Sequence, residues 1–322
     1  MSNRTRPLAG NLSDYDISNL TKLRELYVAY DQVNVALNEI SDFHAMTRSS
    51  SRGGCMTLVG DSGSGKTTIV KSYYDAIRAA NRNVQDEMPA LLVTLPEKCS
   101  IKELCVQILI ALGDPCAEQG TKRSMEIRIK KLMDARKVEL VIFDEFQHMI
   151  DPDRDRVVHT TADWLKTQMN LLRRGYLLVG LPKFERVIRT SDQWRRRVES
   201  RFELRPFGWD SERDQAHFLK FLQVVEKMLP FEDTGGLLRQ ETLPKQLIMA
   251  SNGYVAFVMR LILRASMVAL AHGHTTLQTA HFRKAFRDLE SYGIEAEQNP
   301  FSGMYRREPV ERPVIRKRRE AF

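Results

Sequence analysis

The spacing of hydrophobic and polar positions changes three times along this 322-residue chain. From Asp16 to Leu37, apolar residues recur every three or four positions, which predicts an amphipathic helix or two short ones. After a polar stretch at 47–54, short apolar runs alternate with helical stretches, a pattern typical of a parallel sheet with crossover helices. Past Trp209 only helical spacing remains. We therefore expect an α/β domain followed by a smaller helical domain.

Individual elements follow from the same pattern. The five predicted strands cover residues 55–59, 90–95, 139–143, 176–180 and 201–204. Helices are predicted over 66–80, 125–137, 161–173, 210–229, 244–251, 256–271 and 279–291, and another begins after Ser100, which forms a capping box with Glu103. The domains expected from this are an N-terminal helical extension (1–47), an α/β domain (48–206), a helical lid domain (207–292) and a basic flexible tail (293–322).

Charge adds a class of binding partner to this picture. The chain has 49 Lys and Arg against 41 Asp and Glu, a net charge of +8, which favours binding to polyanions. Basic residues gather at 195–205 and in the last 18 residues, where seven basic side chains face three acidic ones. No apolar run approaches the roughly 18 residues of a membrane span, and the N-terminus lacks the apolar core of a signal peptide. We expect a cytoplasmic protein that does not bind membranes.

A glycine-rich segment between the first strand and the first crossover helix matches the pattern G-x-x-x-x-G-K-[ST]. In this pattern the backbone N–H groups and the helix N-terminus cradle phosphates, the lysine reaches the terminal phosphates, and the hydroxyl ligates Mg²⁺. The alternative, a simple Gly/Ser turn, does not explain the lysine and threonine that follow. The predicted ATP-binding residues are Gly60, Asp61, Ser62, Gly63, Ser64, Gly65, Lys66, Thr67 and Thr68.

Two carboxylates follow the apolar run at 139–143. Ligands of open parallel sheets bind at the carboxyl ends of the strands, which is where Asp144 and Glu145 would lie. We expect Asp144, with Thr67, to hold Mg²⁺, and Glu145 to orient or deprotonate the water that attacks ATP. The chain would then be an ATPase with Lys66, Asp144, Glu145 and, from the arginines described next, Arg201 as catalytic residues. The alternative is that the two carboxylates begin a solvated loop.

Arginines precede and begin the fifth predicted strand. Arg201, or Arg197 before it, could enter the nucleotide pocket of a neighbouring subunit and neutralise charge on the γ-phosphate. Arg195, Arg196 and Arg197 could equally contact DNA, or form a solvated basic face.

Together these features resemble the AAA+ ATPases: the loop GDSGSGKTT, the motif LVIFDE, the strand YLLVG, the SRF arginine and a trailing helical lid. Within them the chain looks most like the TniB/TnsC family of transposition regulators. That narrower resemblance depends on DEFQHM (144–149), LLRRGYLLVGLPKFERV, ALGDP (111–115) and QNPFSG (298–303), and it spans roughly residues 20–303.

The resemblance implies an ATP-dependent DNA-binding protein that assembles into rings or filaments on duplex DNA and links a target-selection protein to the transposase, with hydrolysis driving disassembly. It also implies DNA contacts from Lys102, Thr121, Lys122 and Arg123, a basic, hydroxyl-bearing set suited to phosphate contacts without base readout. Ordinary solvated surface is the alternative for each of the four.

One departure from the family pattern concerns the end of the fourth strand. The family group places a polar sensor there, whereas this chain has Gly180, Leu181 and Pro182. Two other functions remain open on the same motifs: a helicase loader or replication initiator, and a small-molecule kinase with a phosphate-binding loop. The lack of a recognisable helix-turn-helix module argues against an initiator, and the Asp-Glu pair followed by arginines argues against a kinase.

Overall fold

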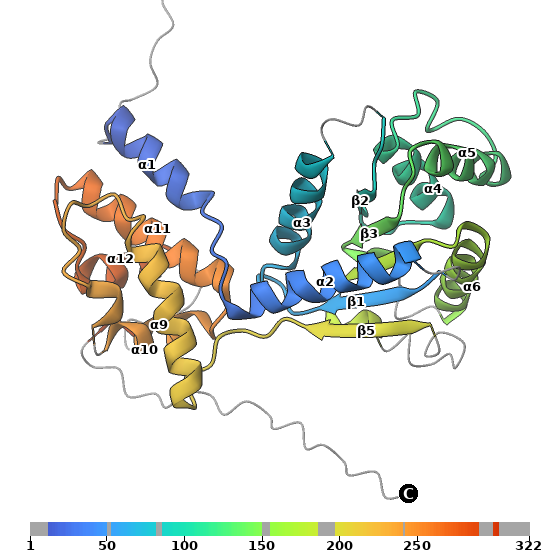
Figure 1. The fold of residues 1–322 in the computed structure, drawn as a ribbon. Coiled ribbons are helices and arrows are strands. Elements are labelled where there is room, and N and C mark those ends of the chain that lie inside the picture. Colours follow the sequence, from blue (N-terminus) through green and yellow to red (C-terminus); the bar gives the residue numbers. More distant parts are fainter. Residues whose placement is uncertain are drawn as a thin grey trace, which may run out of the picture. The chain divides into compact units, whose positions relative to one another are not determined.

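A five-stranded parallel sheet forms the centre of the α/β part of the chain (Figure 1), as the sequence predicts. The computed structural model describes residues 12–49, 53–81, 86–149, 155–185, 197–240, 242–289 and 299–302, without the side chains of 155–162. The strand order is β2-β3-β4-β1-β5. The strands are β1 (Cys55–Val59), β2 (Ala90–Thr94), β3 (Leu140–Asp144), β4 (Gly175–Gly180) and β5 (Val198–Glu203).

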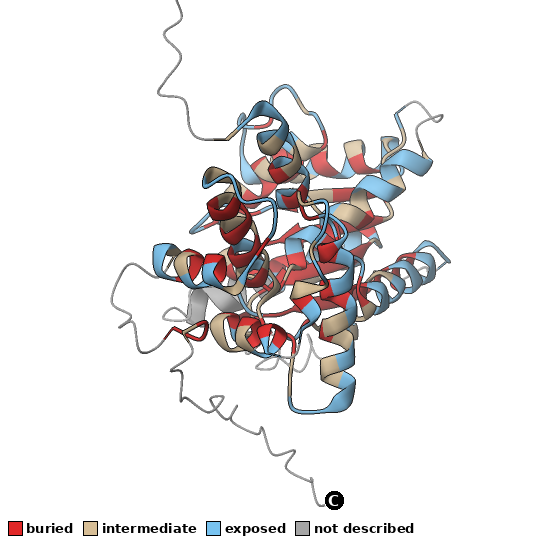
Figure 2. Ribbon diagram, turned by 90° about the vertical axis from the view of Figure 1, so that its left-hand side faces the viewer, coloured by how far each residue is buried: buried red, intermediate tan, exposed pale blue. Residues whose placement is uncertain are grey.

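Helices cover both faces of this sheet. On one face α2 (Asp31–Ser49) contacts β4 and β5, and α3 (Lys66–Ala80) contacts β2, β3 and β4. The other face is covered by α4 (Ile101–Ala111), α5 (Lys122–Ala135) and α6 (Asp155–Leu172). Because both faces are covered, β1, β3 and β4 are buried along their whole length and read as unbroken apolar runs in the sequence (Figure 2).

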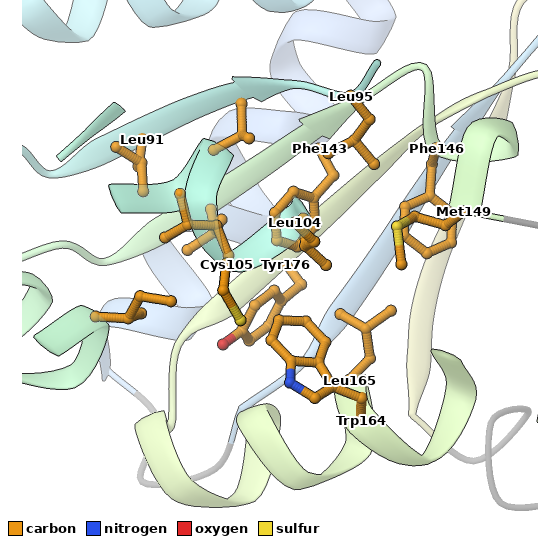
Figure 3. Close-up of a cluster of buried hydrophobic side chains, with 14 of the residues drawn as sticks. Leu91, Leu95, Leu104, Cys105, Phe143, Phe146, Met149, Trp164, Leu165 and Tyr176 are labelled. Atoms are coloured by element: carbon orange, nitrogen blue, oxygen red, sulfur yellow. The ribbon is translucent and has the colours of Figure 1, made fainter. Parts of the chain in front are cut away.

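Alternate residues of the strands enter the main hydrophobic core. Phe143 of β3 and Tyr176 of β4 stack with ring centroids 6.1 Å apart, and Trp164 and Leu165 of α6 lie beneath them (Figure 3). Leu104 from α4 closes the same cluster. The alternation of side chains thus decides which strand residues face α4 to α6. Polar groups can then lie at the ends of the strands, outside this core.

β5 begins three residues earlier than the apolar pattern predicts, at Val198 instead of Arg201. It is the edge strand beside β1, and its residues alternate between half-buried and exposed, as expected for a strand with one neighbour. Glu199, Arg201 and Glu203 on this strand hide its signal from a hydrophobicity pattern.

The remaining described helices form a second compact unit, α1 (Asp14–Arg24), α9 (Glu212–Glu226), α10 (Leu243–Ser251), α11 (Val255–Ala271) and α12 (Thr279–Leu289). Its residues come from 1–28 and 207–322, and the α/β unit comprises 29–206. α1 contacts α11, so the N-terminal segment 1–47 contributes one helix to each unit. No helix among the described residues is long and apolar enough to cross a membrane.

Residues 299–302 are packed although they lie in the segment 293–322 that the sequence predicts as a flexible tail. Phe301 is 1% exposed, and its ring centroid is 5.6 Å from that of Phe282 on α12. Arg283 Nε donates to the carbonyl of Phe301, and Asn299 Nδ2 donates to the carbonyl of Arg283, both at 3.0 Å. The rest of the predicted tail lies outside the described residues.

Candidate nucleotide-binding site

The loop that joins β1 to α3 has the backbone of a phosphate cradle. Gly63 and Gly65 have φ angles of +78° and +97°, which L side chains rarely adopt. Gly60 donates its N–H to the carbonyl of Gly180 at 3.3 Å, and a Cβ on Gly60 would come within 2.7 Å of the carbonyl of Leu204. The glycines are thus required by conformation at two positions and by close approach at a third.

Lys66 in the first turn of α3 is turned back onto this loop. Its Nζ donates to the carbonyls of Gly60 at 2.8 Å and Asp61 at 2.9 Å, and the residue is 7% exposed. Burial lowers the pKa of Lys66, and the carboxylates of Glu145, Asp144 and Asp61 oppose this by favouring the charged form. Phosphate oxygens bound in the cradle could replace the two carbonyls as hydrogen-bond acceptors of Lys66 Nζ. This exchange needs no change in the secondary structure.

Thr67 and Asp144 meet across the site, from α3 and the end of β3. The Thr67 hydroxyl is close enough to the Asp144 carboxylate to favour its charged form, and Asp144 is 1% exposed. Burial raises the pKa of Asp144, while the Thr67 hydroxyl and the bond from the Glu145 N–H oppose that rise. A hydroxyl beside a carboxylate is the protein share of a Mg²⁺ site whose other ligands are phosphates and water. The donor set therefore fits the predicted metal.

Ser64 gives a second indication that the cradle fits an anion. It is 2% exposed, and its Oγ has no hydrogen-bond partner among the described residues. A buried hydroxyl without a partner is costly, so a ligand oxygen within reach would stabilise it. The predicted residues 60–68 lie together on the loop and the first turn of α3, with Asp61, Ser62, Thr67 and Thr68 exposed.

Glu145 follows Asp144 in a backbone conformation that is unusual for a non-glycine residue, with φ of +58°. Its N–H donates to Asp144 Oδ1 at 2.9 Å. Its Oε2 accepts a hydrogen bond from the buried amide of Gln147, whose Oε1 in turn accepts the N–H of Leu181 at 3.1 Å. Gln147 was not among the predicted site residues, although it lies inside the DEFQHM motif.

The candidate trans arginines both have partners within the chain. Arg201 Nε donates to Glu185 Oε1 at 2.5 Å, and this bond raises the pKa of Arg201. Arg197 Nη2 donates to Asn170 Oδ1 at 2.7 Å. Arg195 and Arg196 lie outside the described residues. Glu185, a 7%-exposed acid after β4, was not singled out in the sequence.

The four predicted DNA-binding residues lie at the N-terminal ends of neighbouring helices. Lys102 is exposed in the first turn of α4, Thr121 is the N-cap of α5, and Lys122 and Arg123 are exposed in the first turn of α5. α4 follows β2 and α5 precedes β3, so both helix N-termini lie at the carboxyl edge of the sheet, the edge of the nucleotide loop. Thr121 uses its hydroxyl to accept the Ser124 N–H at 3.3 Å.

Comparison with known families agrees with this geometry. The family model for "Bacterial TniB protein" matches residues 21–208, more than half of the chain. The chain belongs to the TniB family. The match covers the nucleotide loop, the Asp144–Glu145 pair and Arg201 together. TniB membership makes this chain an AAA+ ATPase by family, as the sequence motifs indicate. A search of curated proteins returned no significant match.

Solved structures of AAA+ proteins share the fold. Aeropyrum pernix ORC1, solved in complex with DNA, aligns with a TM-score of 0.63 and 13% identity over 88% of this chain and 71% of its own. Aeropyrum pernix ORC2, solved with ADPNP and ADP, aligns with a TM-score of 0.56 and 16% identity over 80% and 69%. Drosophila ORC bound to DNA aligns with a TM-score of 0.59 and 14% identity over 90% and 69%. At these identities the likeness shows the AAA+ fold alone.

Proposed function

We propose that this TniB-family protein is an ATP-dependent DNA-binding regulator of transposition that oligomerises on duplex DNA, links target selection to the transposase, and disassembles on ATP hydrolysis. The observation on which the proposal depends is that Lys66 Nζ donates to the loop carbonyls of Gly60 and Asp61 while the carboxylates of Asp144 and Glu145 favour its charge from the end of β3. The proposal places the protein in the cytoplasm, where DNA and ATP meet.

For ATP hydrolysis, each of these side chains has a separate task. Lys66 would exchange its carbonyl acceptors for β- and γ-phosphate oxygens. Thr67 and Asp144 would hold Mg²⁺, which neutralises charge between the phosphates. Glu145, held by its N–H and by Gln147, would accept the proton of the attacking water.

For assembly, Arg201 would neutralise the γ-phosphate of a neighbouring subunit. Its side chain is 40% exposed at the edge strand of the sheet, where a second subunit has access. Because a guanidinium has five N–H donors, its Nη groups can contact the phosphate while Nε stays on Glu185, or the whole group can leave Glu185. Arg197 is the second candidate for this role.

For DNA binding, the N-terminal ends of α4 and α5 offer cations and backbone N–H groups, both of which bind phosphate. The residues concerned are Lys102, Thr121, Lys122 and Arg123. Each cation that contacts a phosphate adds about 0.9 to the slope of log K against log salt. Replacing Lys102, Lys122 and Arg123 by Gln should lower that slope by about 2 to 3. The exposed Lys71 on α3 provides the control, and a slope unchanged in the triple variant would contradict this interface.

Sedimentation tests assembly and hydrolysis together. With MgATP and duplex DNA we expect large complexes that disappear as ATP is consumed. Glu145→Gln should keep ATP binding and trap the complexes, whereas Asp75→Asn, an exposed carboxylate on α3, should behave as wild type. Dissociation of the Glu145→Gln complexes at the normal rate would refute the role of Glu145. A protein that stays small and ignores DNA would instead favour a phosphate-loop kinase.

The second candidate is a helicase loader or initiator-like ATPase, which the likeness to ORC proteins solved with DNA favours. The two functions predict different partners for the DNA-bound oligomer. Transposase bound by the ATP-loaded complex, and released with ADP, would support transposition, and a replicative helicase bound in its place would support the alternative.

A further inference from the structure

Gln147 connects Glu145 to the end of the neighbouring strand. It lies in the short 3-10 helix η1 (Phe146–Met149), it is 6% exposed, and its Nε2 donates to Glu145 Oε2. Its Oε1 accepts the Leu181 N–H at 3.1 Å. A backbone N–H can only donate, so Oε1 must face Leu181 and Nε2 must face the carboxylate. The orientation of the amide is thereby fixed.

The same peptide group that binds Gln147 also binds the nucleotide loop. The Leu181 N–H and the Gly180 carbonyl belong to one peptide, and that carbonyl accepts the Gly60 N–H at 3.3 Å. A continuous series of hydrogen bonds therefore leads from the first glycine of the nucleotide loop, through one peptide and one side-chain amide, to Glu145. A shift of the loop could therefore reach Glu145 along these hydrogen bonds.

Gly180 keeps room for this connection. A Cβ at this position would overlap Gln147 Oε1 and lie 3.0 Å from the ring of Phe184. Residues 180–182 are Gly, Leu and Pro, so the three positions at the end of β4 have no polar side chain. A backbone N–H and Gln147 occupy the place where a polar sensor was expected.

We propose that Gln147 is a positioning residue that holds Glu145 for attack on ATP and makes its orientation depend on the nucleotide loop. It binds one carboxylate oxygen, Oε2, and leaves Oε1 for the water. This inference rests on the proposed hydrolytic role of Glu145. Loss of Gln147 should reduce kcat and leave ATP binding intact, because the cradle residues 60–67 do not contact the Gln147 amide directly.

The test uses the full chain with MgATP and duplex DNA. Gln147→Met removes both hydrogen bonds at similar volume, and we expect kcat to fall about 10- to 100-fold, as for other misplaced catalytic groups, with KM within about twofold. Gly180→Ala should give the same change, because its Cβ displaces the Gln147 amide. Gln168→Met is the matched control, since Gln168 on α6 is also 6% exposed, and its kcat should stay within about twofold of wild type.

Gln147→Glu separates positioning from simple support of the fold. Its carboxyl can still accept the Leu181 N–H, but it donates to Glu145 only when protonated. At neutral pH the variant therefore keeps the bond to Leu181 and loses the bond to Glu145, so kcat should fall as in Gln147→Met at a KM within about twofold of wild type. A purely structural role would lower kcat and ATP binding together.

The outcomes are distinct. If wild type hydrolyses ATP and Glu145→Gln does not, yet Gln147→Met and Gly180→Ala both keep the wild-type kcat, the inference is wrong and the proposed function stands. If wild type binds no MgATP, or Glu145→Gln hydrolyses at the wild-type rate, the proposed function fails and this inference fails with it.

Discussion

Arg128 fastens the loop between α4 and α5, and its removal gives a well-defined perturbation. The guanidinium makes three hydrogen bonds to the loop: Nε to Asp114 Oδ2 at 2.7 Å, Nη1 to the carbonyl of Gln119 at 2.9 Å, and Nη2 to the carbonyl of Cys116 at 2.7 Å. The loop leads directly into Thr121 and the proposed DNA-binding turn. Arg128→Gln should therefore loosen the loop and weaken DNA binding together.

The size of the effect follows from the exposure of each partner. The side chain of Asp114 is 8% exposed and that of Arg128 is 29% exposed, so their charged hydrogen bond contributes about 1.5 kcal/mol, at the low end of the usual range. The two bonded carbonyls are exposed and can bind water, which leaves about 0.5 kcal/mol for each. The expected loss is about 2 to 3 kcal/mol, or roughly 4 to 12 °C in Tm for a unit of this size.

Urea denaturation followed by circular dichroism measures this loss, and hydrogen exchange locates it in the loop. Lys131→Gln is the control, because Lys131 is an exposed cation on the same helix and shows no bond to the loop among the described residues. The pKa of Asp114 is lowered, first by the Cys116 N–H and further by Arg128, so Asp114→Asn combined with Arg128→Gln should lose less than the sum of the two single changes. A stability of Arg128→Gln equal to that of Lys131→Gln would refute the reasoning.

Three further predictions concern other parts of the chain. A maleimide should label Cys116 alone in the native protein, because burial raises the pKa of Cys99 and Cys105 to about 12 and Cys55 is also buried; rapid labelling of a second thiol, seen by mass spectrometry, would contradict this. Phe301→Ala should destabilise the helical unit by about 3 kcal/mol in urea, since it empties a fully buried aromatic site, and no loss would mean that the segment is not docked. Burial, and to a lesser extent His274 and His272, lowers the pKa of His281. As the pH drops below about 6.5, the unfolded state therefore binds this proton before the folded state does, and the free energy of unfolding should fall. His281→Gln should flatten that fall between pH 7.5 and 5.5 in urea titrations.

The buried parts of the fold were predictable because burial on both sides leaves an unbroken apolar signal. β1, β3 and β4 are of this kind, and the sequence places their ends within one residue of the structure. β5 has a polar face at the sheet edge, so its predicted start lies three residues after its observed start at Val198. Phe301 was missed for a related reason, since a short docked segment has no periodicity to detect.

The site was predictable where one residue type at one spacing is demanded by chemistry, as at Lys66, Thr67 and Asp144. Gln147 and Glu185 act through partners that are remote in the sequence, Leu181 and Arg201, and only the packing of the strand ends brings these together. A spacing motif contains no information on such contacts. The sequence indicated a role for Gln147 and Glu185 only by placing them within the motifs DEFQHM and LPKFER.

These two missed residues meet at the segment that follows β4. At one end of the 3-10 helix η2 (Pro182–Phe184), the Leu181 N–H donates to Gln147. At the other end, Glu185 accepts a hydrogen bond from Arg201. Between them Phe184 is fully buried and packs edge-on against Phe146, the residue after Glu145, with ring centroids 5.5 Å apart. If Arg201 leaves Glu185 for the nucleotide of a neighbouring subunit, the 9%-exposed carboxylate of Glu185 loses its ion-pair partner and keeps the hydroxyl of Thr57 at 3.5 Å, so Glu185 would shift toward water. Two contacts link η2 to the neighbours of Glu145, the hydrogen bond from the Leu181 N–H to Gln147 and the ring contact between Phe184 and Phe146. Through them that movement would reach the carboxylate of Glu145, so assembly and hydrolysis would be coupled within one chain.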